Sequence, residues 1–181
     1  MILKVARAYA SRVGPIHRRP PERSNSRFRS RSTSRCPPSR HERLRRMSVF
    51  SEAEIAYLQS NTMGRLATIG PDGVPHLVPL TYRFNADEDA IDIGGVDFGT
   101  SKKWRDMLQN PQVAFLVDDA SPAGAHALEI RGEAEAHLSG GELINPRFPS
   151  FQPEFVRIRP RRIVSWGIET EGFFPYARTV R

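Results

Sequence analysis

Short alternating segments joined by tight turns limit the fold of this chain more than any other feature of its sequence. Residues 63–84 run MGRLATIG, PDG and VPHLVPLTYRF, which predicts two strands around a turn whose glycine supplies a positive φ. A third alternating segment follows a polar turn closely enough to pair antiparallel with the second. With this third strand at 90–96, the patterns predict further strands at 112–119, 126–138 and 154–169. Pro160 marks a bend or an edge in the last of them.

Two helices interrupt the strands. Residues 51–60 predict a short amphipathic helix, in which Ser51 caps the start and Glu54 completes a capping box. Residues 100–109 predict a second helix, which begins at Thr100 or Ser101 and stops before a proline. There is no βαβ alternation and no phosphate-loop spacing, so a parallel dinucleotide-binding sheet is not expected. The sequence predicts a mainly β protein, a small antiparallel barrel that is closed or partly open.

Charge divides the chain into two parts. The whole sequence has 27 Lys and Arg against 20 Asp and Glu, but residues 1–46 hold 14 of the basic residues and only Glu22 and Glu42. We therefore expect a disordered extension at 1–46, rich in Arg, Ser and Pro, before a single, mildly acidic domain at 47–181. The extension has three interpretations: a matrix-targeting presequence, a segment that binds RNA or an anionic surface, or sequence upstream of a native start at Met47. The capping box just after Met47 favours the third.

Composition also excludes several kinds of chemistry. The one cysteine, Cys36, lies in the extension, so the domain has no disulfide, no thiolate zinc site and no cysteine nucleophile. No membrane span or secretory signal is visible, which favours the cytoplasm, and the acidic domain makes nucleic acid an unlikely partner. Asp118, Asp119 and His126 follow a strand into a turn without a second set of ligands, so no metal site is predicted. No GxSxG motif supports hydrolysis.

The segment from Ser101 to Arg105, SKKWR, carries the most chemistry. It lies where a glycine-rich strand end leads into a helix, and a helix start offers free N–H groups that bind anions, phosphate above all. Lys103 and Arg105 are two residues apart, so both can reach one phosphate group while Ser101 caps the helix. The alternative is a solvated basic helix face, which charge alone favours.

Together these segments resemble the split-barrel flavin and deazaflavin family, the relatives of pyridoxamine phosphate oxidase, over residues 49–168. The resemblance rests on the opening helix with RLATIGPDGVPHLVPLTYRF, on SKKWRDMLQNPQVAFLVDD, and on VRIRPRRIVSWGIE. The last segment is most similar to the coenzyme F420-dependent branch that includes the actinobacterial tetracycline-pathway reductases. The resemblance implies an FMN-binding type of split barrel that forms a homodimer, with the cofactor in a groove at the interface. The substrate motif of the pyridoxamine phosphate oxidases is not evident near the C-terminus, which argues against vitamin B6 oxidation.

The family's residues can be placed on this chain. Its Ser/Thr-x-Lys-x-Arg phosphate pattern matches Ser101, Lys103 and Arg105, with Lys102 as an extra contact. The resemblance also implies that the facing strand lines the cofactor ring and its tail, through His76, Val78, Pro79 and Thr81.

The resemblance implies hydride transfer from reduced coenzyme F420 to a small conjugated organic substrate. FMN is the alternative cofactor, and a non-catalytic flavin or tetrapyrrole carrier and an RNA-associated protein are the rival functions. No residue is assigned as catalytic, although His76, Tyr82 and Arg105 are candidates to stabilise developing charge or relay a proton. Trp166 is a candidate for the floor of a substrate pocket, but core packing or a dimer contact is the commoner role of a tryptophan near a strand end.

Overall fold

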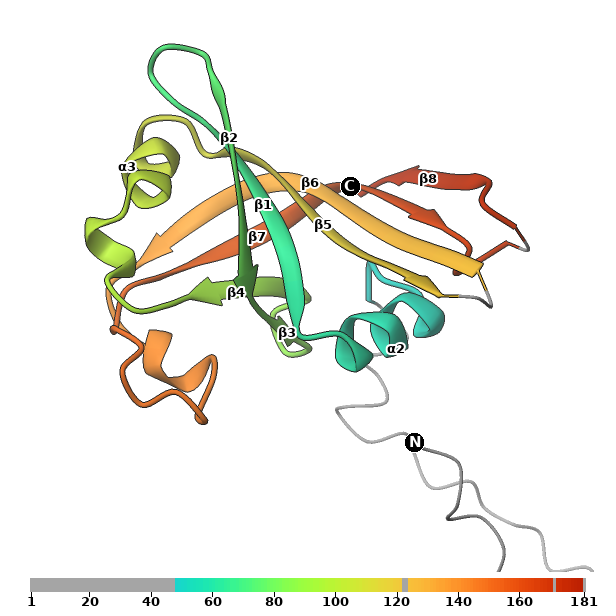
Figure 1. The fold of residues 1–181 in the computed structure, drawn as a ribbon, viewed down its shortest axis with the longest axis horizontal. Helices are drawn as coiled ribbons and strands as arrows, with labels where there is room; N and C mark the ends of the chain where they lie inside the picture. The colour runs from blue at the N-terminus through green and yellow to red at the C-terminus, as the bar shows by residue number, and fades with distance from the viewer. Residues whose placement is uncertain (1–47, 122–123, 171, 181) are drawn as a thin grey trace, which may run out of the picture. The chain divides into compact units, whose positions relative to one another are not determined.

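The structure is a computed structural model that describes residues 48–121, 124–170 and 172–180. In these residues eight antiparallel strands form one curled sheet, a split barrel with two α-helices (Figure 1). The mainly β fold expected from the sequence is confirmed. The helices are α2 (Glu52–Ser60) and α3 (Lys102–Gln109), with short 3-10 turns η1 (Phe98–Thr100) and η2 (Gly141–Leu143). The strands are β1 (Met63–Ile69), β2 (Pro75–Thr81), β3 (Arg83–Asn85), β4 (Ala90–Gly94), β5 (Gln112–Ser121), β6 (Gly124–His137), β7 (Phe155–Trp166) and β8 (Pro175–Thr179).

The strand order leaves one side of the barrel open. The order is β2-β1-β5-β6-β7-β4-β3, with β8 paired to β7. β2 therefore lies at an edge, although the chain passes from β2 to β3 through the single residue Tyr82. The predicted strand at 74–84 is thus two strands, because Tyr82 turns inward. Its hydroxyl donates a hydrogen bond to the Leu58 carbonyl at 2.8 Å, and its ring packs edge-on against Phe115.

Pro160 lies where β7 changes partners. Residues up to Ile158 pair with β4, and residues from Arg162 onward pair with β8. On the other side of β7 the ladder with β6 shifts register between Arg131 and Gly132. A Cβ on Gly132 would lie 2.0 Å from the Arg159 carbonyl oxygen, so this bulge requires glycine. The predicted bend is therefore confirmed.

The core fills the inside of the curled sheet. Alternate residues of β1, β5, β6 and β7 point inward, and α2 and α3 add side chains at its two ends. Burial of these side chains supplies the main driving force for folding. Among the fully buried residues are Leu58, Leu66, Ile91, Ile93, Phe98, Phe115, Val117, Leu128, Ile130, Ile158 and Ile163.

A buried carboxylate joins β3, β4 and β7. Asp92 of β4 is 0% exposed and accepts hydrogen bonds from Arg157 Nε at 2.7 Å, Asn85 Nδ2 at 2.8 Å and Arg83 Nη2 at 3.0 Å. Burial alone would raise the pKa of Asp92, but the bonds from Arg157, Asn85 and Arg83 outweigh burial and hold this pKa below its ordinary value. Arg157 also lies 3.3 Å from Glu88. Both cations therefore have anionic partners.

The helix caps agree with the sequence. Ser51 and Glu54 form the predicted capping box, and Ser101 rather than Thr100 caps α3. The sequence missed β8, whose residues are mostly exposed, so no alternation marks it. The predictions for residues 1–46 and Met47 lie outside the described residues. No helix within the described residues is both long and apolar enough to cross a membrane.

Candidate functional site

The start of α3 is fixed by its contacts to the core. The Ser101 hydroxyl accepts a hydrogen bond from the Trp104 N–H at 3.3 Å and donates to the Phe98 carbonyl at 2.6 Å. Trp104 and Met107 are buried, and the Trp104 ring packs edge-on against Phe98. The first N–H groups of a helix have no partner within the helix, so this start offers donors at a fixed place.

Lys103 and Arg105 lie at this helix start without an anionic partner among the described residues. Lys103 is half-buried, its Nζ is 5.1 Å from the centre of the Phe98 ring, and burial lowers its pKa. Arg105 is exposed, and its Nη1 donates to the Thr100 carbonyl at 2.5 Å. Most other Lys and Arg side chains of the described residues pair with a carboxylate: Arg65, Arg83, Lys102, Arg131, Arg157, Arg159, Arg161 and Arg178.

Lys102 faces a different partner. Its Nζ lies 2.8 and 3.0 Å from the two carboxylate oxygens of Asp106, which is 3% exposed. Thr68 of β1 donates to the same carboxylate at 3.1 Å. The bond from Lys102 is the largest cause that lowers the pKa of Asp106; burial opposes it, and the Thr68 bond adds to it. Lys102 therefore neutralises Asp106 within α3, and the Thr68 bond to Asp106 ties the helix to β1, whereas Lys103 and Arg105 remain available.

His76 of β2 lies beside this ion pair. Its Nδ1 is 3.9 Å from Asp106 Oδ2, and this buried nitrogen has no hydrogen-bond partner among the described residues. The side chain as a whole is 34% exposed. The structure thus brings His76, Lys102 and Asp106 together at one side of the α3 start.

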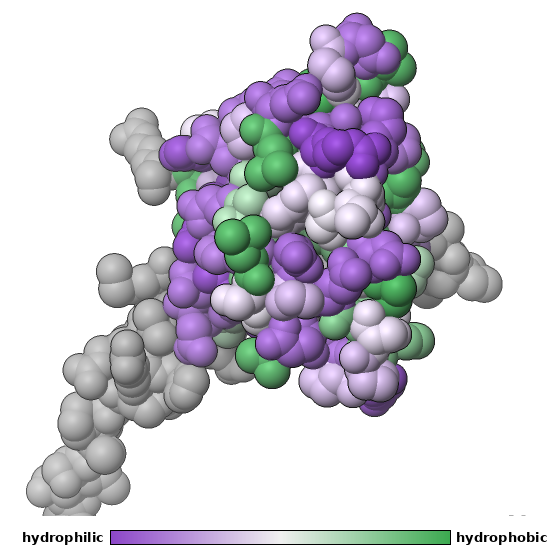
Figure 2. All heavy atoms as spheres, turned by 90° about the vertical axis from the view of Figure 1, so that its left-hand side faces the viewer, coloured by the Kyte–Doolittle hydropathy of each residue, from purple (hydrophilic) through white to green (hydrophobic). Residues whose placement is uncertain are grey.

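The predicted contacts on β2 divide between two faces. His76 and Val78 lie opposite Thr68 and Leu66 of β1, on the face that turns toward the core. Thr81 and Pro79 lie opposite Met63 and Arg65, on the outer face. Successive side chains of a strand point to opposite faces, so one ligand surface cannot contact all four β2 side chains directly. Figure 2 shows the side of the molecule that carries α3, where hydrophilic residues surround small separate hydrophobic patches.

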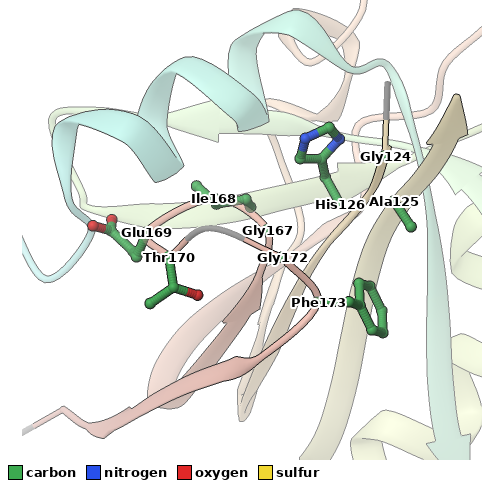
Figure 3. Close-up of a pocket in the computed structure, with 9 residues that line it drawn as sticks. All are labelled: Gly124, Ala125, His126, Gly167, Ile168, Glu169, Thr170, Gly172 and Phe173. Atoms are coloured by element: carbon green, nitrogen blue, oxygen red, sulfur yellow. The ribbon is translucent and has the colours of Figure 1, made fainter. Parts of the chain in front are cut away.

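A cleft lies near the opposite end of β5 and β6. Its volume is about 520 Å³, and its lining comes from the start of β6 and from the segment between β7 and β8, including His126, Glu169, Thr170 and Phe173 (Figure 3). Trp166, the predicted floor of a substrate pocket, stacks on Phe173 with ring centres 6.1 Å apart. The tryptophan therefore contacts a lining residue of the cleft but is not among the residues that line it.

A row of polar groups extends from α2 to this cleft. The Tyr57 hydroxyl donates to Asp119 Oδ1 at 2.7 Å, and His126 Nδ1 lies 3.4 Å from the same oxygen. Burial, with the bond to Asp119 as the next cause, raises the pKa of Tyr57. Asp118, Asp119 and His126 lie in strands, as the predicted ranges 112–119 and 126–138 imply, and the ladder of β5 and β6 pairs Asp119 directly with His126, so they are not part of the turn between these strands.

The structure also places Tyr82 away from any site and shows residues of the cleft that the sequence did not indicate. Tyr82 is not exposed at a site, because its hydroxyl bonds to the Leu58 carbonyl within the core. In the part of the chain that the structure describes, no three His, Cys, Asp or Glu side chains gather as a metal site would require. The sequence analysis missed Tyr57, Glu169 and Phe173. The one available signal was the glycine and aromatic cluster of GFFPY after Glu171, which is unusual in a solvated C-terminal segment.

The fold and the α3 start define a class, an antiparallel split barrel with a cationic helix start beside an edge strand. Residues 50–163 match the sequence profile of the pyridoxamine 5'-phosphate oxidase family, so the chain belongs to this family of split-barrel oxidoreductases. The chain is 43% identical, over 123 residues, to the 5a,11a-dehydrotetracycline/5a,11a-dehydrooxytetracycline reductase of Streptomyces rimosus. That match covers 66% of this chain and 84% of the reductase. The resemblance inferred from the sequence is confirmed.

Two solved structures have a similar fold. A conserved hypothetical protein of Mycobacterium tuberculosis has a TM-score of 0.50 and 29% identity, with 66% of this chain and 86% of that chain covered. A heme-binding protein of Mycobacterium smegmatis has a TM-score of 0.52 and 17% identity, with 72% and 58% covered. At this lower identity the second similarity shows the fold alone.

Proposed function

We propose that this protein is a reductase that uses reduced coenzyme F420 as its hydride donor and acts on a small organic molecule with a conjugated bond. The 43% identity to a tetracycline-pathway reductase supports a reduction of this kind. The observation that carries the proposal is the pair Lys103 and Arg105, which have no carboxylate partner among the described residues and lie in the first turn of α3.

The chemistry of these donors fits a phosphate group. Two cations two residues apart, next to the unpaired N–H groups of a helix start, supply charge and hydrogen bonds to one anion. Ser101 keeps the helix start in place, since its hydroxyl is already bonded to Trp104 N and the Phe98 carbonyl. The phosphates of coenzyme F420 and of FMN both suit this set of donors, so the phosphate site alone does not separate the two cofactors.

In this mechanism the residues of the chain hold and orient the cofactor. When bound, the reduced deazaflavin supplies a hydride, which is the difficult part of the reaction. Lys103 and Arg105 would hold its phosphate at the helix start that Ser101 caps, with Lys102 and His76 beside them. Val78, which shares the β2 face of His76, would lie along the rest of the molecule, whereas the side chains of Pro79 and Thr81 point to the other face. A fixed phosphate restricts the ring to few orientations, which lowers the entropy cost of reaching a reactive geometry. No side chain is assigned as an acid or base for this step.

We further propose that a second copy of the chain covers the outer face of β1 and β2. Met63, Ile69 and Leu77 are 48%, 38% and 64% exposed, and all three point to that face. β2 is also an edge strand with unpaired backbone groups. An apolar sheet face next to a free edge is typical of an interface in a symmetric dimer. Light scattering of the purified chain tests this proposal, and a monomer that still binds cofactor with full affinity would contradict it.

The test of the cofactor is a pair of fluorescence titrations of the full chain, one with coenzyme F420 and one with FMN. We expect F420 to bind at least tenfold more tightly than FMN. A preference for FMN would identify a flavin oxidoreductase, and binding of neither would overturn the phosphate site. If F420 binds, a screen of conjugated acceptors with the reduced cofactor comes next. Binding without oxidation of the cofactor by any acceptor would favour a non-catalytic carrier.

A further inference from the structure

We propose that the cleft between the start of β6 and the segment before β8 is a second binding site, which takes a small molecule with a protonated amine attached to an aromatic ring. The proposal goes beyond the cofactor site and does not depend on it. It rests on the shape of the cleft, on the sign of its charge and on one aromatic side chain (Figure 3).

Two glycines give the cleft its shape. Gly167 and Gly172 have φ values of 64° and 73°, in the left-handed region that favours glycine. A Cβ on Gly167 would lie 2.6 Å from the Ala125 carbonyl oxygen, so the chain after β7 can pass this close to β6 only with glycine. The resulting cleft, of about 520 Å³, is in the usual range for sites of small organic ligands.

The cleft lining carries one carboxylate, Glu169. Asp119 does not line the cleft, but its Oδ1 lies 3.4 Å from Nδ1 of the lining residue His126. Arg178 of β8 interacts with the charge of Glu169 without lining the cleft. Among the described residues that line the cleft there is no lysine or arginine. A ligand with a positive charge would gain Coulombic attraction here, and an anionic ligand would be repelled.

The carboxylates of Asp119 and Glu169 are both held in place by hydrogen bonds from hydroxyl groups. Asp119 accepts a hydrogen bond from the Tyr57 hydroxyl, and Glu169 accepts one from the Ser51 hydroxyl. A carboxylate can accept about four hydrogen bonds, so Glu169 has capacity left for a donor on a ligand, whereas Asp119 acts through its charge next to the lining residue His126. Because the carboxylates are ordered before binding, a ligand would pay less entropy to use them.

Phe173 supplies the aromatic surface. It lines the cleft, is 59% exposed, and stacks on the ring of Trp166. An ammonium group is attracted to the face of an aromatic ring, and a ligand's own ring can stack on it. An aromatic ring next to an amine therefore matches both halves of the lining, the apolar ring and the carboxylate.

The cleft and the start of α3 are separate sites within one chain. β5 begins three residues after α3 ends and runs through ten residues to the end that borders the cleft. Ten strand residues span roughly 30 Å, which is much longer than a flavin ring system. The two sites also differ in sign, since α3 presents cations and the cleft presents a carboxylate.

The test compares two probes on the full chain at pH 7. 2-Phenylethylamine carries the ammonium group, and 2-phenylethanol is its neutral analogue of nearly equal size. Ligand-observed NMR titration should give a dissociation constant for the amine at least fivefold lower than for the alcohol. Equal affinities, or no saturable binding of the amine, would overturn the proposal.

Matched variants place the binding in the cleft. Glu169→Gln should weaken amine binding at least threefold and leave the alcohol unchanged, because the amide keeps an acceptor for Ser51 but has no charge. Glu142→Gln removes the same charge from an exposed loop and should have no effect. Phe173→Ala should weaken both probes. Equal losses in Glu169→Gln and Glu142→Gln would show a general charge effect and contradict a site at the cleft.

The distance between the two sites makes the ligand a separate effector rather than the acceptor substrate of the proposed reductase, because hydride transfer needs the acceptor in contact with the cofactor ring. We therefore expect 2-phenylethylamine not to compete with the acceptor for reduction. Competitive inhibition would contradict a site separate from the cofactor. Because amine binding is measured without cofactor, failure of the proposed F420 chemistry would leave this test intact.

Discussion

The cations around Asp92 and those at the start of α3 are alike in kind but differ in surroundings. Arg83 and Arg157 are held against a fully buried carboxylate that links three strands. Lys103 and Arg105 lie in the first turn of a helix, with no carboxylate beside them among the described residues. A folded chain gains little stability from unpaired cations at one helix start, since like charges and the helix dipole repel them. The difference indicates that the first group holds the fold, and it supports our proposal that the second group binds an anion.

The largest effect should come from breaking the buried network. We expect Asp92→Ala to lower the free energy of unfolding by about 3–5 kcal/mol, because Arg83 and Arg157 would lose their shared partner within a packed sheet. Chemical denaturation of the full chain measures this loss. The start of α3 would be unchanged, so the folded fraction of the variant should bind cofactor normally.

An exposed pair provides the control. Arg65 and Asp118 form an ion pair with side chains 43% and 39% exposed, where solvent screens the interaction. Asp118→Ala should therefore cost less than about 1 kcal/mol. Similar losses in the two variants would contradict the view that burial makes the Asp92 network structural.

The second prediction concerns Lys103, one of the two cations at the α3 start that lack a carboxylate partner among the described residues. Lys103→Ala should weaken binding of coenzyme F420 by about 1–3 kcal/mol, the scale of one charge-assisted contact, and should leave most of the stability in place. A fluorescence titration measures the affinity, and denaturation of the same sample measures the stability.

Two controls separate the site from charge alone. Lys102→Ala removes an equal charge one residue away, but from an ammonium held by Asp106, so binding should change less than twofold while stability falls. Arg147→Ala removes an exposed cation that also lacks a carboxylate partner among the described residues, but from the loop between β6 and β7, and should change neither quantity. An unchanged affinity in Lys103→Ala would remove the basis of the proposed phosphate site.

The sequence predicted the grouping of residues at the α3 start better than that of the cleft, for a physical reason. Ser101, Lys103 and Arg105 lie within five residues, so one local pattern reports the cap and the cations together. Tyr57 of α2 bonds to Asp119 of β5, and Glu169 from the segment before β8 lines the same cleft as His126, and only the folded sheet makes these contacts. The separate role of Lys102 was also hidden, because periodicity does not show that Asp106 is buried and bonded to Thr68.

The third prediction concerns the stability of the fold at low pH. The pKa values of Asp92 and Asp106 are lower in the folded chain than the ordinary value, which is about 3.9 for an unfolded aspartate. Their contribution is therefore complete above the unfolded pKa and is lost as the pH falls through the folded pKa. The free energy of unfolding should decrease as the pH is lowered from about 5 toward 2.

Denaturation at several pH values measures this dependence, and two variants identify its source. Asp106→Asn should make the dependence on pH shallower, because the bond from Lys102 to a carboxylate is removed. Asp87→Asn, which alters an exposed turn residue without an ion pair among the described residues, should leave the dependence as it is. A slope that is equal in the wild type and in Asp106→Asn would contradict a role for this buried carboxylate.

The smallest effect should come from Arg105. Its side chain is exposed, whereas Lys103 is half-buried, so solvent and salt screen the charge of Arg105 more strongly. We expect Arg105→Ala to weaken binding of coenzyme F420 by about 0.5–1.5 kcal/mol at low salt. Raising the salt from about 0.1 M to 1 M shortens the screening length from about 10 Å to about 3 Å, so the difference between wild type and Arg105→Ala should shrink. The difference for Lys103→Ala should persist, because a half-buried cation that contacts the anion directly is screened less. Equal salt dependence in the two variants would mean that both cations act through the general field of the surface rather than through direct contact.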